Sequence, residues 1–525
     1  MSISIYIFSF NNHILFIKHL KEINMRRRSR KRTSSSYFPC EIEKFATDIK
    51  DFFQSSPDVT SKQFEHQGQK IIVIFINYMV EKENIYKHII HVMQQSDEEW
   101  NTESLMNKIP ISGGELRSSL KEIGEDLMMG SVAIYIEGQE HCITYGVPQL
   151  EQREPDRAET ESLIFGPKIA FTESIQTNLN IIHWRLDNPS LVTEKFIIGN
   201  EIPTEVRLVY LKSIANDENV KEMRRRLNKL QTDDVLESSV LTQYIDDNSY
   251  SIFPQLYVTE LPDRFCYEIK EGKIGVMVDK SPSAVIAPIN FFSFFESTED
   301  LYTRWYMGTF IRLMRLIAMF LSITLTPFYV AAITFHYEII PTALLVSLGH
   351  SRSRVPFPPL LEALILEFLI ELIREAGARL PTKVGQTMGI VGGIVIGQAI
   401  VQAGFTSNIL IIIVALSTLA SFTVPSYLMG SAIRIMRFPL IIMAGFWGFI
   451  GIFYSYALIL IHVVKQQSLK RPYFAPIYPF RYKDLNNSIL RIPFHQSNYR
   501  AASNMPKDKK RYEEPSNTKK PDIEE

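Results

Sequence analysis

The sequence is poor in cysteine and nearly balanced in charge. Its three cysteines, Cys40, Cys142 and Cys266, lie far apart without Cys-x-x-Cys spacing, so we predict neither a zinc site nor a disulfide framework. The 56 Lys and Arg residues against 57 Asp and Glu give a formal net charge of −1, which argues against nucleic-acid binding. Free, reduced thiols are typical of a cytoplasmic domain.

The sequence also lacks the short motifs of common catalytic and nucleotide-binding sites. It contains no GxxxxGKS or GxxxxGKT loop, no GxGxxG after a strand, no HExxH and no GxSxG. The acidic pairs Asp233-Asp234 and Asp246-Asp247 have no further spaced ligands, so we interpret them as surface caps rather than a metal site. Nothing in these motifs suggests a catalytic site, and we expect no cofactor.

Charged residues are also scarce between about residue 300 and about residue 465, where Ile, Leu, Phe, Ala and Gly dominate. We therefore expect an α/β cytoplasmic N-terminal region of two subdomains (37–150 and 151–300), followed by an α-helical polytopic membrane domain (301–465). A cytoplasmic basic and polar tail (466–525) ends the chain. Residues 1–36 are expected to be a disordered basic tail, in which Met25 is an alternative natural start.

Short β-rich runs indicate the strands of the two soluble subdomains. IIVIFI (71–76) and SVAIYIEG (131–138) suit buried strands in the first subdomain. In the second, a strand beginning EVRLVYL is followed by a helix over 217–230, with Asp217 as its expected N-cap. KIGVMVD (273–279) and SAVIAP (283–288) are expected to be two further strands.

Five apolar segments follow, over residues 308–335, 357–378, 384–404, 408–428 and 438–464. Arg312 and Arg315 are expected in the headgroup region on the cytoplasmic side, and Pro327 suggests a kink. Basic residues after 464 also indicate a cytoplasmic end, so the number of crossings must be even. Either the acidic segment 357–378 does not cross, or IPTALLVSLG (340–349) contributes a crossing.

The segment 357–378 carries acids in an apolar run. Glu367, Glu371 and Glu375 are four residues apart and share one helix face, and we expect the pairs Glu371–Arg374 and Glu375–Arg379. Carboxylates in lipid are costly and suggest a function. One interpretation is an acidic face that lines a cation path; the other is an interfacial amphipathic helix with its acids in water.

A glycine stripe marks the next segment, VGQTMGIVGGIVIGQAIVQAG (384–404). Glycines every fourth residue predict close helix–helix packing in a membrane, where a neighbouring backbone can approach; they are Gly385, Gly389, Gly393 and Gly397. Amides beside this stripe suggest part of a pore or a gate between subunits. The candidate residues of an ion path or gate are therefore Glu362, Glu367, Glu371, Arg374, Gln386 and Gln398.

Longer stretches, taken in order, resemble the A subunits of GerA-type spore germinant receptors. They include FPQLYVTELPDRFCYEIKEGKIGVMVDKSP, FFSFFESTEDLYTRWYMGTFIR, VPFPPLLEALILEFLIELIREAGARLP, VGQTMGIVGGIVIGQAIVQAG and ASFTVPSYLMGSAIRIMRFP. The resemblance covers roughly residues 150–495. The chain departs from the family pattern at Phe165-Gly166-Pro167, where an arginine precedes Gly-Pro in the family, at Lys280, where a glycine is common, and at Ser426, where an asparagine is common.

This resemblance implies a membrane protein of the spore inner membrane that is not an enzyme. It implies a transporter-like B subunit and a lipoprotein C subunit as partners, a homo-oligomeric assembly, and a role in releasing ions when nutrients are sensed. Two alternatives stay open from the residues alone. A secondary transporter would carry a solute itself, although no inverted repeat is visible, and a non-conducting scaffold would tolerate Gln at the acidic positions.

Overall fold

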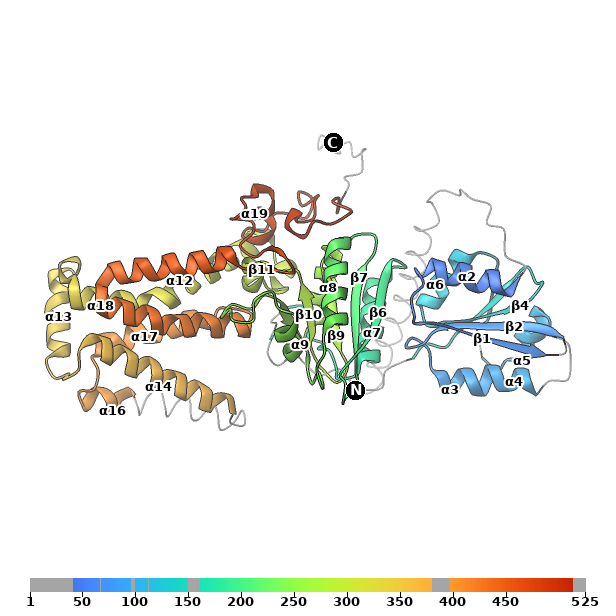
Figure 1. Ribbon diagram of the computed structural model, residues 1–525, viewed down its shortest axis with the longest axis horizontal. Helices are drawn as coiled ribbons and strands as arrows, with labels where there is room; N and C mark the ends of the chain where they lie inside the picture. Colours follow the sequence, from blue (N-terminus) through green and yellow to red (C-terminus); the bar gives the residue numbers. More distant parts are fainter. Residues whose placement is uncertain are drawn as a thin grey trace, which may run out of the picture.

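The computed structural model describes residues 41–512, except 67, 96–99, 112, 150–157, 159–160, 162, 164 and 380–396. Two soluble units lie side by side, and an elongated helical bundle extends from the second of them (Figure 1). The N-terminal tail predicted over residues 1–36, Met25 included, lies outside the described residues, as do Gly385, Gln386, Gly389 and Gly393.

The first unit is a five-stranded antiparallel sheet between two layers of helices. Its strands are β1 (Val59–His66), β2 (Gln69–Ile76), β3 (Glu115–Arg117), β4 (Ser131–Ile136) and β5 (Cys142–Gly146), in the order β1-β2-β4-β5-β3. Helices α2 (Ile42–Phe52) and α6 (Leu120–Met128) cover one face. The other face is covered by α3 (Lys82–Asn84), η1 (Ile85–Ile90), α4 (His91–Gln94) and α5 (Thr102–Lys108) (Figure 1). The predicted strands at 71–76 and 131–138 are confirmed.

The second unit repeats this arrangement with a second five-stranded sheet. Its strands are β6 (Leu191–Ile198), β7 (Thr204–Leu211), β8 (Tyr257–Thr259), β9 (Ile274–Val278) and β10 (Ala284–Ala287), in the order β6-β7-β9-β10-β8. Helices α8 (Asp217–Lys229) and α9 (Ser238–Ile245) pack on one face, and α7 (Ile175–Leu186) and α10 (Pro262–Lys270) pack on the other. Every strand pair is antiparallel, so the strand–helix–strand succession does not build a parallel sheet.

The predicted helix at 217–230 is confirmed as α8, but its N-cap is Asn216 rather than Asp217. The Asn216 side chain accepts a hydrogen bond from the Glu218 backbone N–H at 2.8 Å. Asp217 is instead the first helical residue, where its charge still suits the positive end of the helix dipole. The second predicted pair of strands, at 273–279 and 283–288, corresponds to β9 and β10.

The bundle consists of long helices that run along one axis and a short helix that lies across its far end (Figure 1). After η2 (Phe291–Phe295) and α11 (Glu299–Tyr302), helix α12 (Trp305–Phe335) leaves the second soluble unit and runs without a break through Pro327. Then come η3 (Tyr337–Ile339), α13 (Thr342–Arg352) across the far end, α14 (Pro359–Arg379), α16 (Gly397–Gln402), α17 (Asn408–Ser421) and α18 (Tyr427–Lys465). Among the described residues, α12 and α18 are the two helices long and apolar enough to cross a membrane.

Helix α18 is two antiparallel halves joined at Gly448. This residue has φ 59° and ψ −138°, a conformation that side-chain-bearing residues rarely adopt. Arg437 and Tyr456 lie on opposite sides of Gly448, yet they contact Ser322 and Thr324, which are neighbours on α12. A straight helix would separate Arg437 and Tyr456 by about 28 Å. The chain therefore reverses at Gly448, and the run 438–464, predicted as one span, is divided between two passes.

Contacts give the direction of the remaining helices along the bundle. Glu362 and Ser407 meet near the far end, whereas Glu371 and Ser417 lie closer to the soluble units, beside Arg434 and Ser322. Helices α14 and α17 thus both run toward the soluble units. The chain enters the bundle on α12 and leaves it on α18 at the same soluble unit, so the number of passes is even without counting 340–349, which forms the transverse helix α13.

The chain after α18 folds back onto the second soluble unit. Strands β11 (Gln467–Ser468) and β12 (Arg471–Pro472) form a small hairpin, followed by α19 (Tyr482–Ser488) and η5 (Ala502–Asn504). The Ile289 N–H donates to Ser468 Oγ at 2.9 Å, and the Tyr473 hydroxyl donates to the Pro254 carbonyl at 2.6 Å. Residues 466–512, predicted as a tail, are therefore packed against the unit that precedes the bundle, and we call them the C-terminal segment.

Candidate functional site

Glu367, a predicted site residue, forms the centre of a buried polar cluster inside the bundle. Its carboxylate accepts hydrogen bonds from Arg437 Nη1 at 2.6 Å and from Thr326 Oγ1 at 2.7 Å. The Glu367 and Arg437 side chains are 3 % and 4 % exposed. Helix α14 supplies the carboxylate, the first half of α18 supplies the arginine, and α12 supplies the threonine hydroxyl. The ion pair and this hydroxyl together join three helices.

Arg437 extends this cluster to a fourth helix. Its Nη2 donates to Ser322 Oγ at 2.8 Å and to the Ser417 carbonyl at 3.4 Å, and Ser417 Oγ donates to the Ser322 carbonyl at 2.9 Å. The guanidinium therefore contacts α12, α14 and α17 at one level of the bundle. A displacement of Arg437 would change the contacts of all these helices together.

Glu362 forms a second buried cluster nearer the far end. One carboxylate oxygen accepts from the Ser407 N–H at 2.6 Å and from Thr406 Oγ1 at 3.0 Å, and the other lies 3.7 Å from Arg352 Nη2. Glu362 and Glu367 therefore face the interior of the bundle and are paired with arginines. An interfacial helix with its acids in water does not describe these two positions.

The later acids of α14 become progressively more exposed. Glu371 pairs with Arg374 on the same helix, as predicted, and lies 3.6 Å from Arg434 Nε of α18. The predicted pair Glu375–Arg379 is confirmed at 2.7 Å, with Glu375 54 % exposed. The shared helix face thus runs from the bundle interior at Glu367 to its surface at Glu375.

The glycine stripe is described only at its last position. Gly397 begins α16, and among the described residues no atom lies within 4 Å of a Cβ placed on it. Gln398, its neighbour, is exposed. The close packing expected along the glycine stripe stays a prediction.

Sequence reasoning missed the arginine partners that lie on other helices. Arg434 and Arg437 fall between the expected spans 408–428 and 438–464, whereas the structure places both within the first half of α18. Their spacing of three residues places them on one helix face, and this was the available signal. Arg352 pairs with Glu362 rather than with Glu367. The packing of α13 on the bundle decides which acid it meets.

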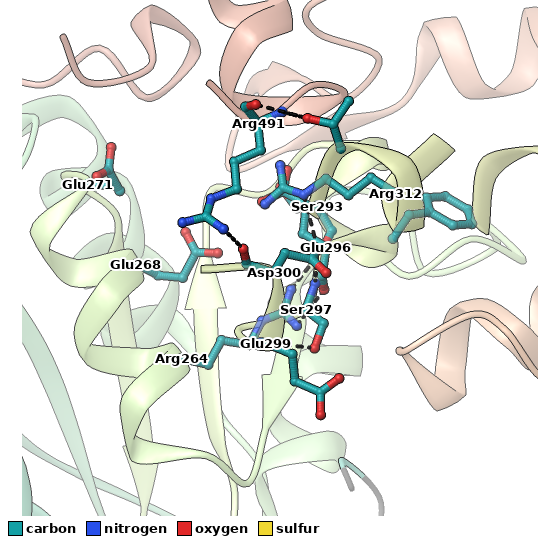
Figure 2. Close-up of polar contacts among 12 residues, drawn as sticks. Arg264, Glu268, Glu271, Ser293, Glu296, Ser297, Glu299, Asp300, Arg312 and Arg491 are labelled. Atoms are coloured by element: carbon teal, nitrogen blue, oxygen red, sulfur yellow. Dashed lines mark hydrogen bonds and ion pairs between the residues drawn. The ribbon is translucent and has the colours of Figure 1, made fainter. Parts of the chain in front are cut away.

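A third charged cluster joins the base of α12 to the second soluble unit (Figure 2). Asp300, which is 1 % exposed, accepts from Arg312 Nε at 3.0 Å and from Arg315 Nη1 at 2.8 Å. Arg264 of α10 donates to the carbonyls of Ser293 and Glu296 at 2.8 and 2.9 Å. Arg312 and Arg315, expected in the headgroup region, are buried against Asp300. We call this cluster the junction.

Arg491 reaches the junction from the C-terminal segment (Figure 2). Its guanidinium donates to the backbone carbonyls of Asp300, Leu301 and Thr303, with 2.7 Å to Leu301. The Arg491 backbone N–H and carbonyl also bond Thr309 Oγ1 of α12, at 3.0 and 2.9 Å. The C-terminal segment is therefore attached to the first turns of α12.

Glu296, also at the junction, has an altered protonation equilibrium. Burial raises the pKa of its carboxyl to about 7, the neighbouring Glu268 adds to the rise, and Arg312 opposes it.

The acid pair Asp246-Asp247 contacts basic and backbone groups: Asp247 pairs with Arg226 at 2.7 Å and accepts a hydrogen bond from the Leu469 N–H at 2.6 Å. The described part of the chain holds no group of three His, Cys, Asp or Glu residues placed to bind a metal ion.

Comparison with known proteins places this architecture in a family. The family described as Bacillus/Clostridium GerA spore germination protein matches residues 47–503. The chain belongs to the GerA family. It is 41 % identical over 448 residues to spore germination protein GerQA of Bacillus cereus, covering 85 % of this chain and 89 % of that protein. It is 36 % identical over 464 residues to spore germination protein KA of Bacillus subtilis (strain 168), covering 87 % of this chain and 85 % of that one.

Among solved structures, this GerA protein matches the N-terminal domain of the A subunit of the Bacillus megaterium spore germinant receptor GerK3. The match has 27 % identity and a TM-score of 0.40, and covers 50 % of this chain and 99 % of that one.

One departure from the family pattern has a structural counterpart in this GerA protein. Lys280, where the family often has glycine, has φ 66°, in the left-handed region that glycine adopts most readily.

Proposed function

We propose that this GerA protein is the A subunit of a spore germinant receptor that couples nutrient sensing to ion release across the spore inner membrane. The family resemblance supports a transporter-like B subunit and a lipoprotein C subunit as its partners. The soluble units lie in the cytoplasm under this proposal. Basic residues at the end of α18, namely Lys465, Lys470 and Arg471, support that orientation.

The bundle is the membrane domain in this proposal. The chain enters and leaves the bundle at the second soluble unit, as an even number of crossings requires. Its outer surface carries many exposed large apolar side chains, which suit contact with lipid tails; examples are Phe310, Ile317, Phe320, Ile450 and Phe453. We propose that several copies assemble around the ion path and that the glycine stripe packs between them.

The ion pair between Glu367 and Arg437 is the observation that carries the proposal. Ionised side chains in a membrane domain are costly and are usually retained for a function. In the described arrangement Arg437 neutralises the carboxylate. We propose that this is the closed state, and that moving Arg437 away lets cations approach Glu367. Glu362, Glu371 and Arg374, with Gln386 and Gln398, belong to the same candidate path or gate.

A set of matched variants tests this proposal in spores. Glu367→Gln and Arg437→Gln each leave one buried charge without its partner, and we expect each to lower the protein level. The double variant Glu367→Gln/Arg437→Gln leaves neutral groups, and we expect it to restore the level, because both unpaired charges are gone. Cation release after a mixed nutrient trigger is then measured, with protein level followed by immunoblot.

The double variant separates the proposed gate from the alternatives. Constitutive or altered cation release at normal protein level supports the gate. Normal release at normal level would reject it and favour the scaffold, while stoichiometric movement of a solute by the purified protein would favour a transporter. Glu375→Gln is the matched control, since this acid is on the same helix but exposed, and we expect it to release cations normally.

A further inference from the structure

A small hollow lies where the C-terminal segment crosses the base of α12. Its volume is about 20 Å³, enough for one water-sized group. It is open on one side. Its lining combines the C-terminal segment with Tyr267, Leu301 and Arg312 of the preceding elements, and the polar groups that matter are Arg312, Arg491, Arg511, Asn486 and Ser497.

The lining of the hollow is strongly cationic. Three of its residues are arginines, and none is an aspartate or a glutamate. Arg312 has Asp300 as its partner, and Arg511 has Glu271 at 2.9 Å. Arg491 donates to the carbonyls named above rather than to a carboxylate. It is 8 % exposed, and its Nε lacks a hydrogen-bond partner in the part of the chain that the structure describes.

A buried guanidinium without a counter-charge is costly, and an anion in the hollow would remove that cost. Both Nη atoms of Arg491 donate to carbonyls, and Nε, itself sealed from solvent, has no partner among the described residues. Arg312 and Arg511 lie in the other walls, each beside a carboxylate. One negatively charged oxygen in the hollow, from outside the chain, would therefore give Arg491 the counter-charge that it lacks.

The surroundings of the hollow indicate where this anion comes from. Exposed aromatic side chains lie on both elements that form it: Trp305 and Tyr306 at the start of α12, and Phe480, Tyr482 and Phe494 on the C-terminal segment. Tryptophan and tyrosine gather at the level of lipid headgroups in membrane proteins. Phe494 also lies against the Arg491 guanidinium, 4.9 Å from its ring centre. The hollow thus lies at headgroup level if the bundle spans the membrane.

We propose that this hollow binds the phosphate of an anionic phospholipid headgroup. One phosphate oxygen enters between Arg491 and Arg312, and the remainder of the headgroup stays at the open side, consistent with the small volume. The bound lipid would join the C-terminal segment, through Arg491, to α12. The inference rests on the membrane location in the proposed function, but not on ion release.

Binding of defined lipids to the full-length protein tests this proposal. The protein is purified in a zwitterionic detergent, and native mass spectrometry measures binding of phosphatidylglycerol, of phosphatidylcholine with the same acyl chains, and of inorganic phosphate. We expect phosphatidylglycerol to bind at least about tenfold more tightly than phosphatidylcholine, because both carry the phosphate but the choline of the second adds a positive charge beside the three arginines. If phosphatidylcholine binds equally well, or if inorganic phosphate displaces phosphatidylglycerol at equal concentration, a lipid-specific site is rejected.

Three variants locate the binding. Arg491→Gln is expected to remove the preference for phosphatidylglycerol, whereas Lys483→Gln, the same charge change on exposed α19, is expected to keep it. Equal losses in both variants would mean diffuse attraction to a basic surface and would overturn the proposal. Since Arg491 also binds α11 carbonyls, Asn486→Trp provides a second test by filling the hollow. Unchanged phosphatidylglycerol binding in a folded Asn486→Trp protein would equally overturn it.

Discussion

The bundle and the junction differ in the number of buried arginines for each buried carboxylate. In the bundle, Glu367 has one arginine, Arg437, and Glu362 has one, Arg352. At the junction, Asp300 serves both Arg312 and Arg315, Glu296 lies 3.9 Å from Arg312, and Arg491 adds a third guanidinium held by carbonyls. The bundle pairs are therefore neutral by themselves, whereas the junction keeps an excess of positive charge.

This difference separates two tasks of buried charge. Under the proposed function, a one-to-one pair between helices opens to a passing cation when its arginine moves, because each arginine holds a single carboxylate. Removing the shared carboxylate of Asp300 would leave Arg315 without a carboxylate and Arg312 with only Glu296 at 3.9 Å, so Asp300 holds the base of α12 to the second soluble unit. We therefore expect the junction to be the firmer attachment of the bundle and the inner pairs to be its adjustable contacts.

The largest expected effect is at Asp300. Asp300→Asn removes the carboxylate from two buried arginines, and we expect it to lower the free energy of unfolding by about 5 kcal/mol, the upper end for a broken buried pair. Thermal unfolding of the purified protein and its level in spores measure this loss. Glu299→Gln, on the adjacent residue of α11, is the control and should lose less than about 1 kcal/mol. Equal losses in both variants would contradict the central position of Asp300.

The next effect distinguishes the two regions by rescue. Glu367→Gln should cost about 3–5 kcal/mol, and adding Arg437→Gln should recover most of it, since the pair is one-to-one. Adding Arg315→Gln to Asp300→Asn should recover little, because Arg312 still lacks its carboxylate. Double-mutant cycles on thermal unfolding measure both couplings. If Arg315→Gln restored the stability of Asp300→Asn, or if Arg437→Gln failed to restore that of Glu367→Gln, the two regions would not differ in the way described.

A smaller effect concerns pH and the junction alone. Because the pKa of Glu296 is raised to about 7, the folded state holds a proton that the unfolded state has lost above about pH 4.5. The stability from this group is complete below that pH and disappears as pH rises through 7. Glu296→Gln, which mimics the protonated form, should exceed the original protein by less than about 1 kcal/mol at pH 5 and by up to about 3 kcal/mol at pH 8. Thermal unfolding at both pH values checks this, and a pH-independent difference would contradict it.

The smallest effect is expected at the exposed end of the acidic helix. Glu375→Gln breaks only the surface pair with Arg379 and should change the free energy of unfolding by less than about 0.5 kcal/mol. The same unfolding assay measures it. A loss as large as that of Glu367→Gln would show that the face of α14 is not graded from interior to surface.

Local patterns predicted much of this architecture from the sequence. The buried strands β2, β4, β9 and β10, helix α8 and the pairs Glu371–Arg374 and Glu375–Arg379 depend on neighbours within a few residues. The length of the apolar run 308–335 likewise predicted α12. The acids Glu362 and Glu367 were selected because carboxylates are rare in such runs, and both lie inside the bundle.

Contacts between distant residues could not be predicted in the same way. The partnership of Glu367 with Arg437 spans 70 residues and depends on how α14 packs against α18. The reversal at Gly448 depends on a single backbone conformation in a run, GFWGFIG, that is otherwise typical of a continuous helix. The return of the C-terminal segment is likewise a tertiary feature, since its polar composition equally suits a free tail.

The reversal at Gly448 has a mechanical consequence. Because the second half of α18 returns to the second soluble unit, the chain is attached to that unit both where it enters the bundle and where it leaves it: Arg312 and Arg315 hold the start of α12, and His462, beside Ser251 at 3.1 Å, marks the return of α18. With a single attachment, a movement of the unit would act on α12 alone. With two, the same movement acts on α12 and on the end of α18 together.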